Sequence, residues 1–255
     1  MTDPVPLLGP DDPAPLEVVN PEGRVPLVLV CEHAGRAFPA GLGRLGLSAE
    51  ASLRHIAWDI GAEGVARHLS ALLDAPLFLQ RYSRLVIDCN RPFAAPDLIP
   101  EVGDLEPVPG NAGLTAAERQ ARFDAVHRPF HAALAAWLAA HPGARMVTIH
   151  SFTPMLRRTG APRPWQIGLL YVRDDRLSLR LMAALRAQDP ALVAAFNEPY
   201  QADDLSDYAL PVHGEARGTE YAMIEIRNDL IATPEGQADW AGRIARALRP
   251  ALPLS

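Results

Sequence analysis

The sequence contains no lysine, so all 24 of its basic residues are arginine. Schiff-base enzymes, pyridoxal-phosphate enzymes and Walker-type nucleotide hydrolases need a lysine amine at the reacting centre, and these classes are therefore excluded. The 30 acidic residues outnumber the basic ones and give a net charge of −6. This sign disfavours binding to a phosphate backbone, so we expect no nucleic acid partner.

Cysteine is also scarce, with only Cys31 and Cys89 in 255 residues. Both lie in apolar runs without C-x-x-C spacing, which indicates buried reduced thiols rather than a disulfide or a zinc cluster. No apolar run approaches the ~18 residues of a membrane span, and the acidic, proline-rich start lacks the features of a secretion signal. We expect a cytoplasmic protein with no membrane partner. The composition and the hydrophobic pattern of the sequence give no indication of the oligomeric state.

What the sequence does contain is an alternation of short apolar runs with helical patterns, in a chain that is 49% hydrophobic. Residues 1–22 are rich in proline and aspartate and predict an extended arm without regular structure, followed by a single domain over 23–255. Strands are predicted over 25–31, 84–89, 144–152, 166–172 and 221–227. Helices are predicted over 48–74 with a break near Gly61, over 115–141 with a kink at Pro129, and over 176–188, 191–197 and 235–248.

This alternation predicts an α/β fold with a parallel or mixed sheet that is covered on both faces. Ligands of such folds gather at the carboxyl ends of the strands. Three apolar runs end in polar pairs, namely Glu32–His33, Asn90–Arg91 and His150–Ser151. We therefore expect these side chains to meet at one edge of the sheet.

His33 and His150 are the first candidates for chemistry, although each alone is most simply an ordinary histidine at the edge of a loop. Together with a carboxylate, two imidazoles form a common set of ligands for catalytic zinc that leaves one position for water. The carboxylate is either Asp59, in the segment AWDIGA, or Glu32. Asp59 is favoured because the side chains of adjacent residues at a strand end often diverge.

Glu225 lies inside the predicted strand YAMIEIR, on the same face as Arg227. A carboxylate in a buried strand either forms an ion pair with an arginine or acts as a desolvated general base that takes a proton from an activated water. Arg84, Arg91 and Arg227 are candidate clamps for an anionic substrate, although each alone is more simply part of a structural ion pair.

Two further segments carry weaker signals. The segment 212–218 is bounded by glycine and predicts a mobile loop that brings His213 or Arg217 toward the substrate. The segment 197–204 either lines the pocket through Asn197 and Tyr200 or forms a simple turn.

Seven segments in order resemble the N-formylglutamate amidohydrolase family from about residue 25 to 250: CEHAGRAFP, AWDIGA, SRLVIDCNRP, TIHSF, NEPY, HGEARG and IEIRNDLI. The resemblance implies hydrolysis of an N-acyl amide on a small anionic amino acid, with N-formyl-L-glutamate and water giving formate and glutamate in histidine breakdown. It also implies a phosphorylase/hydrolase-like three-layer α/β/α sandwich with a mixed, mostly parallel sheet and one divalent metal, zinc.

A more distant similarity to zinc carboxypeptidases and to deacylases of the succinylglutamate desuccinylase and aspartoacylase type implies roles for individual residues. It implies that His150 binds the metal, that Asn90 and Arg91 hold the substrate carboxylate, and that Glu225 is the base. Arg84 or Arg227 would then stabilise the oxyanion or a side-chain carboxylate, and Asn197, His213 and Arg217 are further candidates for substrate binding. His33 is followed three residues later by Arg36 instead of the glutamate of those enzymes, which leaves the third ligand open between Asp59 and Glu32.

Two alternatives compete with this interpretation. The first is a deacylase or carboxypeptidase-like enzyme of the same fold that acts on another N-acyl amino acid or peptide. The second is a non-catalytic protein that binds small carboxylates and has lost its metal.

Overall fold

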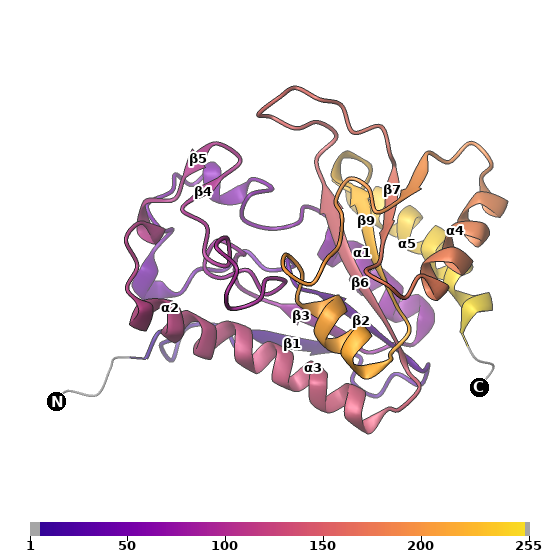
Figure 1. The fold of residues 1–255 in the computed structure, drawn as a ribbon, viewed down its shortest axis with the longest axis horizontal. Helices are drawn as coiled ribbons and strands as arrows, with labels where there is room; N and C mark the ends of the chain where they lie inside the picture. The colour runs from indigo at the N-terminus through magenta and orange to yellow at the C-terminus, as the bar shows by residue number, and fades with distance from the viewer. Residues whose placement is uncertain (1–5, 253–255) are drawn as a thin grey trace.

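A seven-stranded sheet in the order β1-β3-β2-β6-β9-β7-β8 forms the centre of the computed structural model, which describes residues 6–252 (Figure 1). The strands are β1 (Leu16–Val19), β2 (Leu27–Cys31), β3 (Leu77–Gln80), β6 (Arg145–Phe152), β7 (Ile167–Leu170), β8 (Ala194–Phe196) and β9 (Tyr221–Arg227). A separate ribbon pairs β4 (Val102–Gly103) with β5 (Glu106–Pro107). The pairs β2–β3, β2–β6, β6–β9 and β7–β8 are parallel, and β1–β3 and β7–β9 are antiparallel.

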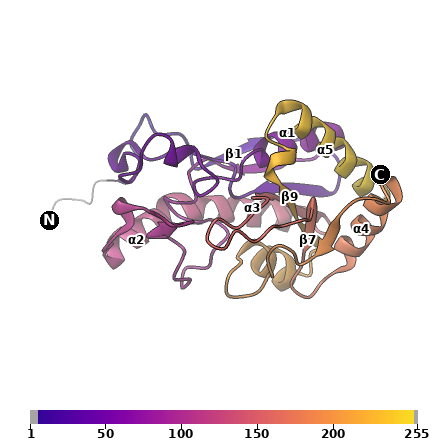
Figure 2. The ribbon, with the colours of Figure 1, turned by 90° about the horizontal axis from the view of Figure 1, so that it is seen from above.

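Helices cover both faces of this sheet. They are α1 (Ala62–Leu73), α2 (Ala116–Arg122), α3 (Arg128–Ala140), α4 (Arg176–Gln188) and α5 (Pro234–Leu248). Alternate residues of the central strands point to opposite faces, so Leu27 and Leu29 join the core beneath α1, α4 and α5, while Val28 and Val30 join the core that includes α3. Figure 2 shows α1 and α5 side by side on their face of the sheet. This arrangement confirms the predicted α/β/α sandwich and its mixed, mostly parallel sheet.

Four of the five predicted strands are confirmed. They were predictable because a strand that is buried on both faces of a largely parallel sheet leaves a continuous apolar run in the sequence. The strand predicted over 84–89 is wrong. The shorter run Leu77–Gln80 pairs with β1 and β2 instead, and the residues of 84–89 form turns whose apolar side chains fill the core under α3. Asn90 and Arg91 therefore follow a buried loop and not a strand.

The helical predictions need three corrections. The 48–74 helix begins only at Ala62, where Gly61 has the left-handed φ of 82°, and Ser48 caps a short turn. The 115–141 helix keeps its Thr115–Glu118 capping box but divides into α2 and α3 at a π-helical turn over 123–127, just before Pro129, whose nitrogen has no hydrogen to donate. The 191–197 segment is not a helix, because it contains the edge strand β8.

Residues 16–19 of the proline-rich arm form the regular strand β1, which pairs with β3. The prediction of an arm without regular structure is therefore wrong for this part, and residues 1–5 lie outside the described range. Both cysteines are buried and unpaired, as predicted. In the described range, no helix has the length and apolar character needed to cross a membrane.

Candidate metal centre and active site

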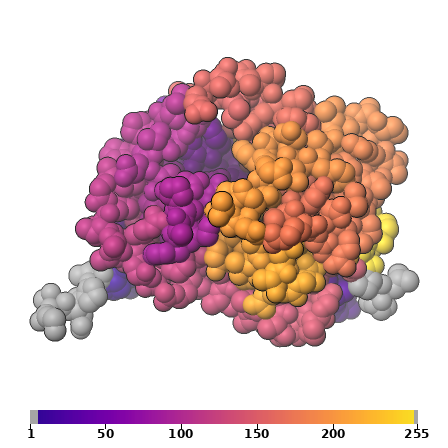
Figure 3. All heavy atoms as spheres, in the orientation of Figure 1, coloured from indigo at the N-terminus to yellow at the C-terminus, as the bar shows by residue number. Residues whose placement is uncertain are grey.

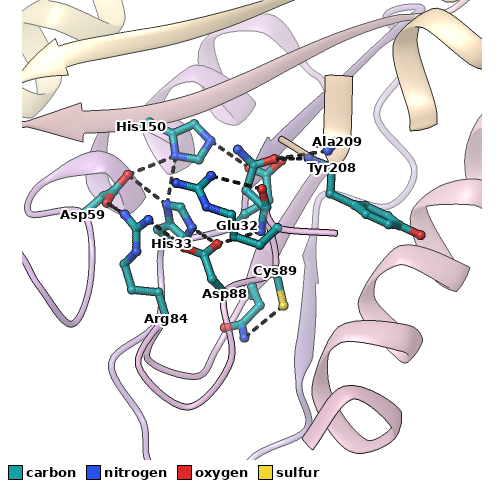
Figure 4. A network of polar contacts seen from close by, with 12 residues as sticks. Glu32, His33, Asp59, Arg84, Asp88, Cys89, His150, Tyr208 and Ala209 are labelled. Carbon is teal, nitrogen blue, oxygen red and sulfur yellow. Dashed lines mark hydrogen bonds and ion pairs between the residues drawn. The ribbon is translucent and has the colours of Figure 1, made fainter. Parts of the chain in front are cut away.

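Four acidic and imidazole side chains that are distant in the sequence meet at one edge of the sheet. Figure 4 shows three of them, His33, Asp59 and His150. His33 lies in the turn after β2, and Asp59 lies in the loop before α1, where its backbone N–H donates to the carbonyl of His33. His150 on β6 and Glu225 on β9 occupy paired positions of neighbouring parallel strands. The two side chains therefore point to the same face of the sheet.

Three ligand atoms form a compact triangle at the centre of this group. His150 Nδ1 lies 3.2 Å from His33 Nδ1 and 3.0 Å from Asp59 Oδ2, and His33 Nδ1 lies 3.4 Å from the same oxygen. All three side chains are buried. Bonds of 2.0–2.1 Å in a tetrahedral zinc site place donor atoms about 3.3 Å apart, so the triangle fits a cation of this kind.

The other nitrogen of each imidazole faces a second carboxylate. His33 Nε2 lies 2.6 Å from Asp88 Oδ1, and His150 Nε2 lies 3.1 Å from Glu32 Oε2. Such outer carboxylates commonly fix the orientation and tautomer of histidines that bind metals. Glu32 thus lies behind His150, whereas Asp59 faces both Nδ1 atoms. Of the two candidates for the third ligand, the geometry favours Asp59.

Electrostatics also suit a cation at this position. Burial raises the pKa of Asp59, but the facing imidazoles of His33 and His150 outweigh it and hold that pKa well below its usual range. Burial lowers the pKa of His150, but Glu32 and Asp59 outweigh it and raise that pKa well above normal. A divalent cation at the triangle would replace the proton that the carboxylates now favour on His150.

Glu225 differs from these groups because no basic side chain lies within ion-pair distance of it among residues 6–252. Its side chain is buried, and its Oε2 atom has no hydrogen-bond partner within residues 6–252. Burial raises the pKa of Glu225 to about 7. The ion pair with Arg227 that would explain a buried glutamate is not formed, since Arg227 Nε donates instead to Asp229 at 2.8 Å. A buried carboxylate oxygen without a partner is suited to receive a proton from a ligand or water in the cavity.

These groups open into a cavity of about 400 Å³. Figure 3 shows a hollow where the magenta part of the chain, near residue 100, faces the orange part, near residue 200. The predicted residues that line the cavity are His33, Asp59, Arg84, Asn90, Arg91, His150 and Glu225. Sequence reasoning missed Asp88, which holds His33, and Asp207 and Ser206 in the wall. No pattern in the sequence distinguishes these residues from other loop residues.

Two arginines and an asparagine shape the cavity. Arg84 donates to Asp88 at 2.6 Å and approaches Asp59 at 3.4 Å, so its positive charge lies directly beside the triangle. Arg91 donates to Asp97 and to the carbonyl of Ser206. All polar atoms of the Asn90 side chain bind the segment 207–209, so this residue fixes the cavity wall.

Four predicted site residues lie outside the cavity. Arg227 pairs with Asp229, and the Asn197 side chain accepts a hydrogen bond from the backbone N–H of Tyr171. Arg217 is exposed, and His213 is buried in a histidine cluster. Tyr200, from the same segment as Asn197, does line the cavity.

The histidine cluster supports the backbone that carries Asn90 and Arg91. His127 Nε2 donates to the carbonyl of Arg91 at 3.0 Å, and His131 Nε2 donates to the carbonyl of Cys89 at 2.6 Å. His213 Nε2 donates to His131 Nδ1 at 3.0 Å. Because His131 accepts at Nδ1 while it donates from Nε2, its ring must be neutral.

Acidification is therefore expected to destabilise the protein. Burial lowers the pKa of His127 and of His213 from 6.5 to about 4, so the unfolded chain binds more protons between these values. Stability is complete above pH 6.5 and falls as the pH drops to about 4, by up to about 3 kcal/mol for each ring. Urea unfolding at pH 7, 6 and 5 measures this loss.

His213→Gln should flatten the pH dependence of the free energy of unfolding, and His141→Gln, at an exposed histidine, should leave it unchanged. An equal slope in His213→Gln and the wild type would contradict the interpretation.

Comparison with known proteins identifies relatives over nearly the whole chain. The family model of N-formylglutamate amidohydrolase matches residues 25–232. A crystal structure of a gene product from Agrobacterium tumefaciens is 39% identical, with 96% of this chain and 99% of that chain covered and a TM-score of 0.88. The N-formylglutamate amidohydrolase of Ralstonia eutropha has the same fold at 24% identity, with 93% and 97% coverage and a TM-score of 0.68.

A weaker likeness joins the chain to the succinylglutamate desuccinylase of Chromobacterium violaceum. The identity is 13%, the coverage is 92% of this chain and 65% of that chain, and the TM-score is 0.43. No curated protein matches the sequence significantly.

Proposed function

Because the chain belongs to the N-formylglutamate amidohydrolase family of hydrolases, we propose that it cleaves the amide bond of a small N-acyl amino acid, with N-formyl-L-glutamate as the substrate. Formate and L-glutamate are then the products, and the reaction is a step of histidine breakdown in the cytoplasm. The proposal includes one zinc ion held by His33, Asp59 and His150. The observation that carries it is the triangle of three donor atoms beside Glu225, a buried glutamate that lines the cavity and has no hydrogen bond or ion pair from its side chain within residues 6–252.

The bound zinc supplies a Lewis acid that polarises the acyl carbonyl and makes water more acidic. The side chains of the protein do the rest. Glu225 takes one proton as the water oxygen bonds to the acyl carbon, and it returns this proton to the nitrogen as the carbon–nitrogen bond breaks. Arg84, held by Asp59 and Asp88, presents positive charge where the carbonyl oxygen becomes negative.

The amino acid part of the substrate needs its own partner. Arg91 lines the cavity and is the best placed arginine for the α-carboxylate, and Asn90 positions it by fixing segment 207–209. Arg227, Asn197, His213 and Arg217 do not line the cavity, and we assign them no contact with the substrate.

A panel of N-formyl, N-acetyl and N-succinyl amino acids tests the proposal. We expect kcat/KM for N-formyl-L-glutamate to exceed that for N-acetyl-L-glutamate by about 10- to 200-fold, because one additional methyl group in a fitted pocket has an effect of this size. The Glu225→Gln protein, purified in parallel, reports any contaminating deformylase. Preference for an N-acetyl or N-succinyl substrate would instead establish a deacylase of the same fold. Binding of carboxylates without turnover or a metal requirement would establish a non-catalytic binder.

A further inference from the structure

Arg163 is a buried arginine without an acidic partner. It lies in the connection between β6 and β7, which projects at the top of Figure 1, and it is 8% exposed. Its Nη1 atom donates to Thr153 Oγ1 at 3.3 Å and to Tyr200 Oη at 3.1 Å, and its guanidinium lies 4.9 Å from the centre of the Tyr200 ring. Within residues 6–252, no carboxylate lies within 4.0 Å of it.

Burial of a cation without an anion is costly unless a ligand supplies the missing charge. Arg122 is also buried without an acidic partner, but it donates three hydrogen bonds to the carbonyl oxygens of Val86, Gly110 and the Asn111 side chain. Arg163 has only two hydroxyl groups as side-chain partners. Its guanidinium therefore retains donors for an anionic ligand.

Arg163 lines a second cavity of about 290 Å³, which adjoins the proposed active site. Arg84 and Tyr200 belong to the walls of both cavities. To reach Arg163, the side chain of a substrate whose amide lies beside Glu225 would pass the wall that Arg84 and Tyr200 share between the two cavities.

Two of the three arginines in the wall of the second cavity, Arg157 and Arg163, have no acidic partner within residues 6–252. Each carboxylate in its wall already has a cationic partner, in the pairs Asp88–Arg84, Asp97–Arg91 and Asp104–Arg54. Of the two unpaired arginines, Arg157 is exposed and Arg163 is buried. An anionic group is therefore favoured there over a neutral one.

We propose that this second cavity binds the carboxylate of the substrate's side chain and that Arg163 is the residue that selects it. The inference rests on the proposed function and deepens it, because it explains how a dicarboxylic substrate is chosen over its neutral analogues. The planar guanidinium matches a carboxylate with two parallel hydrogen bonds. The amide of a glutamine side chain has the same shape but leaves the positive charge of Arg163 without a counterion.

Arg163→Met in the metal-loaded enzyme tests this selection. We expect the wild type to prefer N-formyl-L-glutamate over N-formyl-L-glutamine by about 100-fold or more in kcat/KM, and the variant to lose most of that ratio through a higher KM for the glutamate substrate. Arg163→Lys keeps the positive charge but lacks the two parallel N–H donors of the guanidinium, so it should retain part of the ratio that Arg163→Met loses. Arg158→Met, at an exposed arginine outside both cavities, should keep the whole ratio. If Arg163 only held Tyr200 in place, both substrates would lose activity equally and the ratio would stay unchanged, which would overturn the inference.

Ligand binding separates this inference from the proposed function. Calorimetry compares glutarate with its monoamide, glutaramate, on the wild type and on Arg163→Met, whose metal content and melting temperature are checked first. Tighter binding of glutarate that depends on Arg163 supports the subsite even if no N-acyl amino acid is hydrolysed. Hydrolysis of N-formyl-L-glutamate with a Glu-to-Gln ratio that Arg163→Met does not change leaves the function standing and removes the subsite.

Discussion

Glu225→Gln is expected to lower kcat by about 10³-fold, within the 10²- to 10⁴-fold range that general acid–base catalysis contributes. The amide of glutamine fills the same buried space but cannot accept a proton from water at neutral pH. Since Glu225 is not one of the three donors of the triangle, the metal content should stay at the wild-type level. Steady-state kinetics with metal analysis on the same samples measures both quantities.

The pH profile gives a second readout of the same change. Burial raises the pKa of Glu225 to about 7, and the base works only when it is deprotonated, so the wild-type rate falls as the pH drops through this pKa. A bound cation lowers the pKa, which places the inflection of the loaded enzyme at or below pH 7. The residual rate of Glu225→Gln should lack this inflection. Glu50→Gln, at an exposed glutamate, should behave as the wild type. A kcat of Glu225→Gln within tenfold of the wild type would refute the role of base.

His150→Ala should abolish metal binding and reduce turnover at least as severely as Glu225→Gln, because it removes one of three donors and leaves Glu32 buried without its partner. Asp88→Asn should have an intermediate effect. It keeps all three donors but weakens the support of His33, a change that typically costs 10- to 100-fold in metal affinity. Metal titration of the chelated proteins measures the three metal affinities, which should decrease from the wild type to Asp88→Asn to His150→Ala.

A control separates loss of metal from loss of structure. His141→Ala removes an exposed histidine and should bind metal like the wild type. Chelated wild-type protein should regain turnover when Zn²⁺ is added, whereas chelated His150→Ala should not. Full metal content and full turnover in His150→Ala would exclude His150 from the site.

The sequence was informative about the fold where a strand is buried on both faces. The runs at 25–31, 144–152 and 221–227 became β2, β6 and β9, because only a central parallel strand needs apolar residues on each side. The run at 84–89 carries the same composition but packs as turns against α3, and periodicity cannot separate these outcomes in so short a segment. The same ambiguity turned the expected helix at 191–197 into β8.

The site was predictable to the extent that it depends on strand ends. His33, His150 and Glu225 lie on or directly after strands that are neighbours in the sheet, so their meeting follows from the topology. Asp88 and Arg163 come from irregular segments whose paths no periodic pattern describes. Asn197 and His213 stood out in the sequence because of their motifs, yet both lie outside the cavity and hold neighbouring segments through hydrogen bonds.

X-ray absorption spectroscopy of the purified protein, combined with its metal content and turnover, tests the central claim most directly. We expect one divalent cation per chain, bound by two imidazole nitrogens and a carboxylate oxygen, with turnover and this absorption signal lost together on chelation. Full turnover in protein with less than about 0.1 equivalent of metal, or a cation whose ligands persist in His150→Ala, would contradict it.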